Sequence, residues 1–428
     1  MSTVPSLRRP KRTIVPHGGD NPLPVDAAVA MQRIERLCSF AGRYPGTDAE
    51  RRAANDLAGQ LRGAGRRVEI EPTHVHPQWA LVHAAHLALA IAGSLVAIAS
   101  PAAGFVLVLL TATSLYLDLN SRLYLLRRLF FRRASQNVLG RGRRPEAPAR
   151  IVISAHYDAG RTGAVYGERA TRIAARLPRA ARVVLAPMRI VFWSLALLVP
   201  LLGARLAGID ASWLAAIQLV PTVVLIVAFV ALLDIALSPV VTGANDNASG
   251  VAVAMALEEA LAEEPPSQLD VWLLLTGGHE CLGEGMRSFV REHADELAEA
   301  PTYFLVLDAV GSGDVHYATS EGLAVSYQLD LRLAQICEAI ATADRESENR
   351  FRAVATASGS LTDALPASQA GHPAIALVGA AGPGLPPPHH HSRSDTPDRI
   401  DPGALERFHD FALELVRQID RDTDRRLG

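Results

Sequence analysis

The chain has 428 residues and a formal net charge of −2 at neutral pH. This length fits two or three ordinary domains, or one large α/β domain with insertions. The balanced charge excludes a global basic field, so we expect no nucleic-acid partner. The three cysteines, Cys38, Cys281 and Cys337, are too few and too widely spaced for a disulfide framework, which favours a reducing compartment.

The chain begins with basic residues that have no apolar run behind them. We therefore interpret residues 1–25 as a flexible cytosolic tail and not as a secretory signal. Residues 26–78 follow as the first part of the main domain. Their apolar positions recur at helical spacing on both sides of Pro45-Gly46, and a short strand follows Gly65.

Two long apolar blocks interrupt this domain. The first lacks Asp, Glu, Lys and Arg from Ala80 to Leu117. One helix of that length would measure about 57 Å, against roughly 30 Å for a hydrocarbon core. We therefore predict transmembrane hairpins over residues 79–118 and 190–237, which makes four spans. Buried helices of a soluble core are the alternative, although such helices seldom stay apolar on every face.

Arginine placement predicts the orientation of these spans. The segment 119–189 contains 16 Arg and no Lys against three acidic residues, so the positive-inside rule places it in the cytoplasm. An even number of crossings returns residues 238–428 to the same side. The protein is thus expected in the cell membrane, with one cytoplasmic domain built from three segments. The arginine-rich stretch 168–184 is either an interfacial helix on a lipid bilayer or a solvated helix.

The remaining sequence alternates apolar runs with amphipathic helices. The runs at residues 149–158, 269–280, 302–314 and 372–382 are continuously apolar, as strands buried on both faces tend to be. Residues 402–428 predict a closing helix. We therefore expect an α/β fold with a mostly parallel, mixed sheet flanked by helices and interrupted by two transmembrane hairpins.

Polar side chains stand where these strands end. They are His156 and Asp158, Asp246 before a helix, Glu280, Asp308, and His391 before the last helix. Carboxyl ends of parallel strands meet at one sheet edge, and this donor set suits zinc. Taken singly, each residue is more simply a helix cap or a hydrogen-bonded structural group.

The order of these motifs resembles the M28 family of di-zinc metallopeptidases, which are mostly aminopeptidases. The chain carries H-x-D, D-N-A-S-G, a paired position followed by G-x-x-x-F-V, D-x-x-G, and H-S-x-x-D-T. The likeness covers almost all of residues 26–420 outside the hairpins. It implies a zinc-aminopeptidase-like fold with two zinc ions per chain and a peptide substrate.

The resemblance also assigns roles to individual residues. It implies that His156 and Asp308 bind one zinc ion, that Glu280 and His391 bind the other, that Asp246 bridges both, and that Asp158 orients His156. The H-S-x-x-D-T spacing favours His391 over its two neighbours, which are expected to be solvent-exposed. The interval from His156 to Asp246 is longer than the family usually shows, and the second hairpin accounts for the excess.

One position departs from the family pattern. The family carries Glu-Glu where this chain carries His279-Glu280, and the first Glu is the general base. A neutral imidazole can accept a proton, so His279 is the expected substitute. Glu284 as a relocated base is an alternative, and a metal site with altered or no peptidase activity is another.

These points predict a membrane-anchored exopeptidase that removes N-terminal residues with water activated by two zinc ions. A metal-binding pseudoenzyme or scaffold is the alternative, because His279 replaces the usual base. Carboxypeptidase or glutaminyl cyclase chemistry is a third option. The preferred side chain and the oligomeric state do not follow from the sequence.

Overall fold

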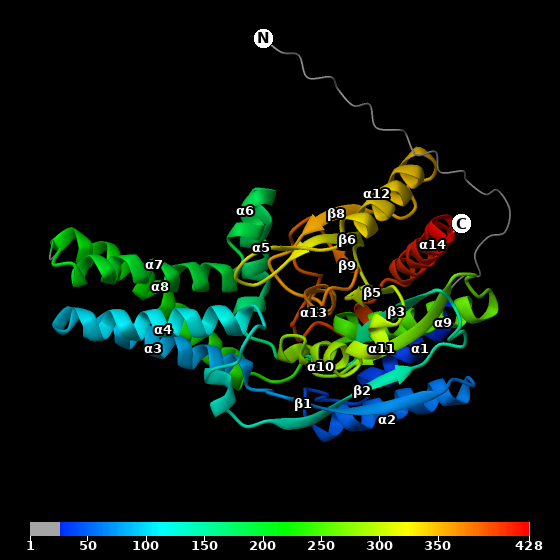
Figure 1. Cartoon of the computed structure of the whole chain (residues 1–428), viewed down its shortest axis with the longest axis horizontal. Coiled ribbons are helices and arrows are strands. Elements are labelled where there is room, and N and C mark those ends of the chain that lie inside the picture. Colours follow the sequence, from blue (N-terminus) through cyan, green and yellow to red (C-terminus); the bar gives the residue numbers. More distant parts are fainter. Residues whose placement is uncertain (1–25, 210, 428) are drawn as a thin grey trace, which may run out of the picture.

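The protein is described by a computed structural model over residues 26–209 and 211–427, so the expected tail at residues 1–25 lies outside the described residues. These residues form one α/β domain and a bundle of long helices that projects from one end of it (Figure 1). In the described part of the chain, nine strands make one sheet in the order β1-β2-β4-β3-β5-β9-β6-β7, with β8 paired to β6. The strands are β1 (Val68–Val75), β2 (Arg133–Gly140), β3 (Ala149–His156), β4 (Leu269–Thr276), β5 (Thr302–Asp308), β6 (Asp314–Glu321), β7 (Tyr327–Gln328), β8 (Val354–Ala357) and β9 (Ala374–Ala380).

The centre of the sheet is parallel and its edges are mostly antiparallel. Strands β4, β3, β5 and β9 pair in parallel. By contrast, β2 joins β1 and β4 in antiparallel pairs, and β6 runs antiparallel to β9 and β7. The predicted mixed sheet is therefore confirmed, with its parallel part confined to the central strands and the β6–β8 pair.

Helices cover both faces of the sheet, which explains why the central strands are apolar throughout. Along β3, Ile151 and Ile153 pack into one core cluster, whereas Val152 packs into another on the opposite face. The first face carries α1 (Ala27–Cys38), α2 (Asp48–Gly63), α9 (Gly250–Glu263), α12 (Leu331–Glu346) and α14 (Pro402–Leu427). The second carries α10 (Glu284–Glu292), α11 (Ala294–Ala298) and α13 (Ala364–Gln369).

Four long helices form the projecting group, which we name the apolar bundle. They are α3 (Trp79–Ala99), α4 (Pro101–Leu119), α7 (Pro187–Leu206) and α8 (Ser212–Leu237). All four are long and apolar enough to cross a membrane. They expose large apolar side chains, including Ile98 at 67% and Val220 at 64%, which would be unfavourable in water. The helices fall on the predicted apolar blocks, and their crossing of a membrane stays a prediction.

Two short helices, α5 (Glu168–Arg176) and α6 (Arg179–Val184), lie between the apolar bundle and the sheet (Figure 1). They cover the stretch predicted to be either interfacial or solvated. Arg179 donates to the Ala355 carbonyl at 2.6 Å, and Arg182 donates to the Pro383 carbonyl at 3.0 Å. At least two of the arginines therefore bind the α/β domain itself.

A buried charged network joins the apolar bundle to the α/β domain. Near the end of α4, Asp118 lies 2.9 Å from His83 Nε2 and 2.6 Å from Arg127 Nη2. Arg127 also donates to Glu284 Oε1 at 3.0 Å, and Glu284 accepts a hydrogen bond from the His76 backbone N–H at 2.6 Å. Arg127 is fully buried, so it is held by charges from both parts of the chain.

Candidate metal centre

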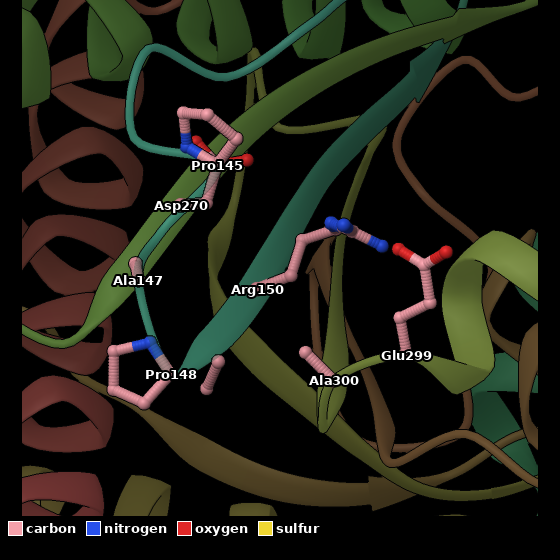
Figure 2. A pocket seen from close by; sticks show the side chains of 8 residues that line it. Pro145, Ala147, Pro148, Arg150, Asp270, Glu299 and Ala300 are labelled. Carbon is pink, nitrogen blue, oxygen red and sulfur yellow. The ribbon is translucent and has the colours of Figure 1, made fainter.

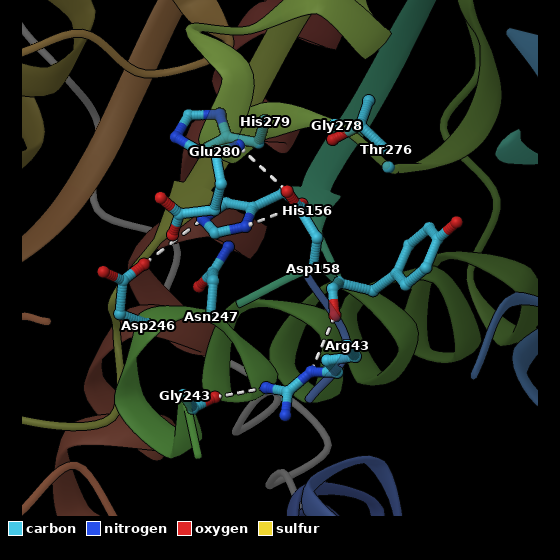
Figure 3. Close-up of polar contacts among 12 residues, drawn as sticks. Arg43, His156, Asp158, Gly243, Asp246, Asn247, Thr276, Gly278, His279 and Glu280 are labelled. Carbon is cyan, nitrogen blue, oxygen red and sulfur yellow. Dashed lines mark hydrogen bonds and ion pairs between the residues drawn. The ribbon is translucent and has the colours of Figure 1, made fainter. Parts of the chain in front are cut away.

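The candidate residues meet at the C-terminal edge of the parallel strands, as the sequence predicts. Figure 3 shows three of them, His156, Asp246 and Glu280. His156 is the last residue of β3, and Asp308 is the last residue of β5. Glu280 lies in the turn after β4, Asp246 lies in the segment before α9, and His391 lies in the loop between β9 and α14. Five side chains from five separate stretches therefore share one site.

Their polar atoms lie close together in two groups. His156 Nε2 lies 3.3 Å from Asp246 Oδ1 and 3.8 Å from Asp308 Oδ1. His391 Nε2 lies 3.2 Å from Glu280 Oε2 and 3.6 Å from Asp246 Oδ2. Two ligand atoms at about 2.1 Å from a tetrahedral ion lie about 3.4 Å apart, so these separations suit a metal centre. Asp246 presents one carboxylate oxygen to each group, as a bridging ligand would.

Several of these buried atoms lack a hydrogen bond within the described chain, although charged partners are near. Neither His156 Nε2 nor Asp246 Oδ2 has one. His390 Nδ1 lies 2.8 Å from Asp246 Oδ2 but outside hydrogen-bonding geometry. Buried polar groups normally find partners. Here the carboxylate oxygens and imidazole nitrogens lie close together without forming well-aligned hydrogen bonds. Such an arrangement is suited to binding a pair of divalent ions such as zinc.

The electrostatics of the site also favour a cation. Burial would raise the pKa of Asp246, but the charge of His390 and the close contact with His156 hold it well below its usual value. The pKa of Glu280 is likewise lowered by His391 against the effect of burial. Burial lowers the pKa of His391, but the opposing effect of Glu280 and Asp246 is larger and raises this pKa to about 9. Ionised carboxylates thus dominate the cluster, and protons balance them where no metal is bound.

Asp158 lies beside the His156 ring nitrogen that faces away from the candidate metal centre, as a residue that orients this ring would. Its Oδ1 is 3.3 Å from His156 Nδ1, and its Oδ2 accepts a hydrogen bond from the Glu280 backbone N–H at 2.9 Å. Asp158 is fully buried. One carboxylate therefore contacts both a candidate ligand ring and the backbone of a second candidate ligand, which is the outer support that metal sites use.

Two further supporting residues were not singled out from the sequence. Asp395 accepts hydrogen bonds from the backbone N–H groups of Asn245, at 2.6 Å, and Asp246, at 3.1 Å. Arg43 donates to the carbonyls of Tyr157, at 2.8 Å, and Gly243, at 2.6 Å (Figure 3). Asp395 is the Asp of the H-S-x-x-D-T motif, so that motif was its signal.

His279 has a carboxylate partner that sequence reasoning missed. Its Nδ1 lies 2.8 Å from Asp363 Oδ1, and the other oxygen of Asp363 accepts a hydrogen bond from Thr276 at 2.5 Å. The His279 ring stacks on His156 with centroids 4.0 Å apart. Burial and the charge of His156 lower the pKa of His279, but Asp363 raises it to about 9. The His279 ring is therefore fixed in orientation by Asp363.

The turn that carries His279 needs a glycine. Gly278 has φ +66°, and a Cβ there would lie 2.5 Å from Val75 Cγ1. This backbone conformation and the missing side chain let the chain fold back directly after β4. The turn therefore brings both His279 and Glu280 to the edge of the sheet.

The structure disagrees with two other expectations, one for Glu284 and one for His390. Both carboxylate oxygens of Glu284 are engaged, one by Arg127 and one by the His76 backbone, which disfavours Glu284 as a relocated base. His390 was expected to be solvent-exposed and is instead half-buried against Asp246. His389 is exposed, as expected, and its Nδ1 lies 2.8 Å from Ser394 Oγ.

A separate hollow of about 310 Å³ lies at the opposite end of β3 (Figure 2). Pro148, Arg150, Asp270 and Glu299 help to line it. Arg150 stacks over Trp272 at 4.1 Å, so its side chain has a structural position. None of the candidate ligands lines this hollow, and it is not part of the candidate centre.

Comparisons with known proteins agree with the motif order. Residues 222–416 match the family model of Peptidase family M28, a range that includes Asp246, Glu280, Asp308 and His391. No curated protein sequence matches the chain. The family match confirms the resemblance inferred from the sequence.

Several solved structures share the fold at low sequence identity. A leucine aminopeptidase precursor from Bacteroides thetaiotaomicron is 15% identical with a TM-score of 0.52, covering 93% of this chain and 98% of its own. A glutaminyl cyclase from the same organism, bound to N-acetylhistamine, is 15% identical with a TM-score of 0.53 over 93% and 99% of the two chains. A Zn-dependent exopeptidase from Parabacteroides distasonis is 14% identical with a TM-score of 0.52 over 94% and 98%. At this identity the likeness concerns the fold.

Proposed function

We propose that this protein, whose residues 222–416 match Peptidase family M28, is a membrane-anchored, zinc-dependent exopeptidase that removes N-terminal residues from peptides. The observation that carries this proposal is the position of Asp246, which offers one oxygen to His156 and the other to His391. The folds of an aminopeptidase precursor and a Zn-dependent exopeptidase support the reaction class.

The residues present would hold two zinc ions. His156 and Asp308 would bind one ion, and Glu280 and His391 would bind the other, with Asp246 between them. When bound, the ions would polarise the scissile carbonyl and lower the pKa of a water molecule. The remaining chemistry falls to the side chains around them.

His279 would serve as the general base. Without metal the pKa of His279 is about 9, so its ring is mostly a cation at neutral pH. Bound zinc ions would repel that charge and favour the neutral ring, which donates its Nδ1 proton to Asp363 and carries its free lone pair on Nε2. His279 Nε2 would take a proton from the attacking water while the water oxygen bonds to the carbonyl carbon. It would return that proton to the leaving amine as the C–N bond breaks, which yields a free amino acid and a shortened peptide.

A metal-binding protein without peptidase activity is the second candidate. A ring nitrogen of His279 lies within 4.8 Å of ligand atoms of His156 and Asp308, so the ring could bind a metal. A ring that binds metal cannot accept a proton. His279→Glu would then create peptidase activity that the natural protein lacks, whereas loss of existing activity in His279→Ala would favour the base.

The membrane part of the proposal has two steps. The apolar bundle would cross the bilayer as two hairpins, because its four helices have the necessary length and expose apolar side chains. The domain side would be cytoplasmic, because the segment 119–189 carries 16 Arg against three acidic residues.

The test uses purified full-length protein in detergent. Metal analysis should give about two zinc ions per chain, and a peptide panel should lose N-terminal residues until a chelator is added. His391→Ala should lose metal and activity, whereas the matched His389→Ala, at an exposed neighbouring histidine, should keep both. Full metal loading with no hydrolysis would defeat the proposal, and release of ammonia from N-terminal Gln peptides would indicate cyclase chemistry instead.

A further inference from the structure

The second hairpin holds a loop of the candidate site. After α8 ends at Leu237, the chain pairs with the loop that follows β3: Thr162 donates to the Pro239 carbonyl at 3.1 Å, and Val241 donates to the Gly160 carbonyl at 2.9 Å. In the same loop, the Ala164 N–H donates to Asp234 Oδ2, near the end of α8, at 2.7 Å. The end of a predicted span is thus bonded directly to this loop.

This loop passes against the candidate ligands. A Cβ on Gly160 would lie 2.5 Å from His391 Nε2 and 2.7 Å from Glu280 Oε1, so only a glycine fits there. Further along, the ring of Tyr166 meets the ring of His391 edge to face, with centroids 4.6 Å apart. The loop therefore connects the end of α8 to one half of the metal centre.

The first hairpin is linked to the turn that carries Glu280. Arg127, which pairs with Asp118 at the end of α4, also donates to the Cys281 carbonyl at 3.3 Å. Cys281 follows the candidate ligand Glu280 in the chain. The second hairpin therefore bonds directly to a loop that touches the candidate ligands, and the first hairpin is linked through Arg127 to the turn that carries Glu280.

The apolar interior of the bundle continues to the site. Tyr166, Leu282 and Leu361 pack against the core cluster formed by buried residues of all four bundle helices. Tyr166 contacts His391, Leu282 follows Glu280 by two positions, and Leu361 precedes Asp363 by two. The residues around the centre thus share a core with the predicted spans.

The segment after α4 has the composition of a bilayer-facing surface. It exposes Leu123 at 40%, Leu125 at 44%, Leu129 at 80% and Phe131 at 52%. Arginines 122, 128 and 132 alternate with these residues in the sequence. Exposed apolar side chains interleaved with arginines suit the boundary between headgroups and acyl chains.

From these contacts we infer that the centre faces the bilayer and acts on peptides whose N-termini lie at the membrane surface. Such peptides are membrane-anchored chains with only a short segment between the anchor and the N-terminus. This inference rests on the proposed exopeptidase function and adds its substrate class. A site that receives peptides from bulk water would instead open away from the membrane anchor. Here the ends of both hairpins are joined to segments that contact the candidate ligands.

The test compares distances between a membrane anchor and the reactive N-terminus. Zinc-loaded full-length protein is reconstituted in phosphatidylcholine vesicles with peptides that share one N-terminal sequence and carry a C-terminal palmitoyl chain. The spacer between the two has either about four residues, which extend to about 13 Å, or about 24 residues, which extend to about 80 Å. A free peptide with no acyl chain is the third substrate, and His391→Ala in the same vesicles measures contaminating peptidases.

The α/β domain is on the order of 50 Å across, so a four-residue spacer cannot reach its far side. We expect kcat/KM for the short-spacer peptide to lie within about threefold of the long-spacer value. A short-spacer value at least tenfold lower would overturn the inference and leave the exopeptidase function intact, because the long-spacer and free peptides would still be cleaved. No release from any of the three substrates would instead reject the function on which the inference rests.

Discussion

Asp363 offers the sharpest test of how His279 works. The substitution Asp363→Asn keeps the size of the side chain and removes its charge. Asparagine can donate its amide to His279 Nδ1, which would move the ring proton to Nε2 and remove the lone pair that accepts a proton from water. The perturbation therefore acts on the tautomer of a neighbouring ring, through a contact of 2.8 Å.

The expected loss follows from the role assigned to His279. General-base catalysis typically contributes about 10² to 10⁴ in rate. An aspartate that fixes the tautomer of a catalytic histidine can be worth about 10⁴ in kcat, as in serine proteases. We therefore expect kcat to fall by about 10² to 10⁴. KM should change by less than about threefold, because Asp363 contacts His279 Nδ1 and has no assigned contact with the substrate.

Initial rates on one leucyl peptide, measured with zinc content and thermal stability, check this expectation. Asp344→Asn is the matched control, since Asp344 is another buried carboxylate that accepts backbone hydrogen bonds, from Arg350 and Phe351, both at 2.9 Å. It should lower stability and leave kcat unchanged. A double variant with His279→Ala should be no slower than His279→Ala alone. Near-normal kcat in Asp363→Asn, or additive losses in the double variant, would refute the reasoning.

Three other predictions concern the rest of the molecule. Glu284→Gln weakens the buried pair with Arg127 and should lower the unfolding free energy by on the order of 3 kcal/mol, without slowing catalysis in the folded protein. A hundredfold loss of kcat at unchanged thermal stability would indicate instead that Glu284 is the general base. Zinc affinity should rise as pH increases from 6.5 to 8.5, because the pKa of His391 is about 9 without metal and zinc must displace its proton; chelator competition measures this, and a flat affinity would contradict it. In intact cells an impermeant maleimide should label Ala207→Cys, between α7 and α8, but should label Ser347→Cys, after α12, only once the cells are permeabilised, and the reverse pattern would place the domain outside.

Much of the candidate site could be predicted from the sequence, because its residues stand at strand ends. His156 and Asp308 close β3 and β5, and the parallel register of the central strands brings them to one edge. A strand after Gly65 was predicted, but its antiparallel pairing with β2 was not foreseen, because the two strands lie on either side of the first hairpin. Pairings across so long an insertion leave no local pattern in the sequence.

Asp363 could not have been found in the same way. It precedes the short helix α13, where an aspartate is ordinarily an N-terminal cap. Its contact with His279 spans 84 positions of sequence and depends on how α13 packs on the sheet. The same holds for His390, because the spacing of three consecutive histidines cannot tell which of the rings turn inward.

The buried network around Arg127 determines which parts of this protein can exist alone. Removing the first hairpin would delete Asp118 and His83 and leave the Arg127 guanidinium inside the fold with one carboxylate fewer, which costs about 3–5 kcal/mol when a buried partner is lost. That is a large fraction of the stability of an ordinary domain. An α/β domain that lacked α3 and α4 would therefore be unstable, so the first hairpin belongs to the folding unit of the α/β domain.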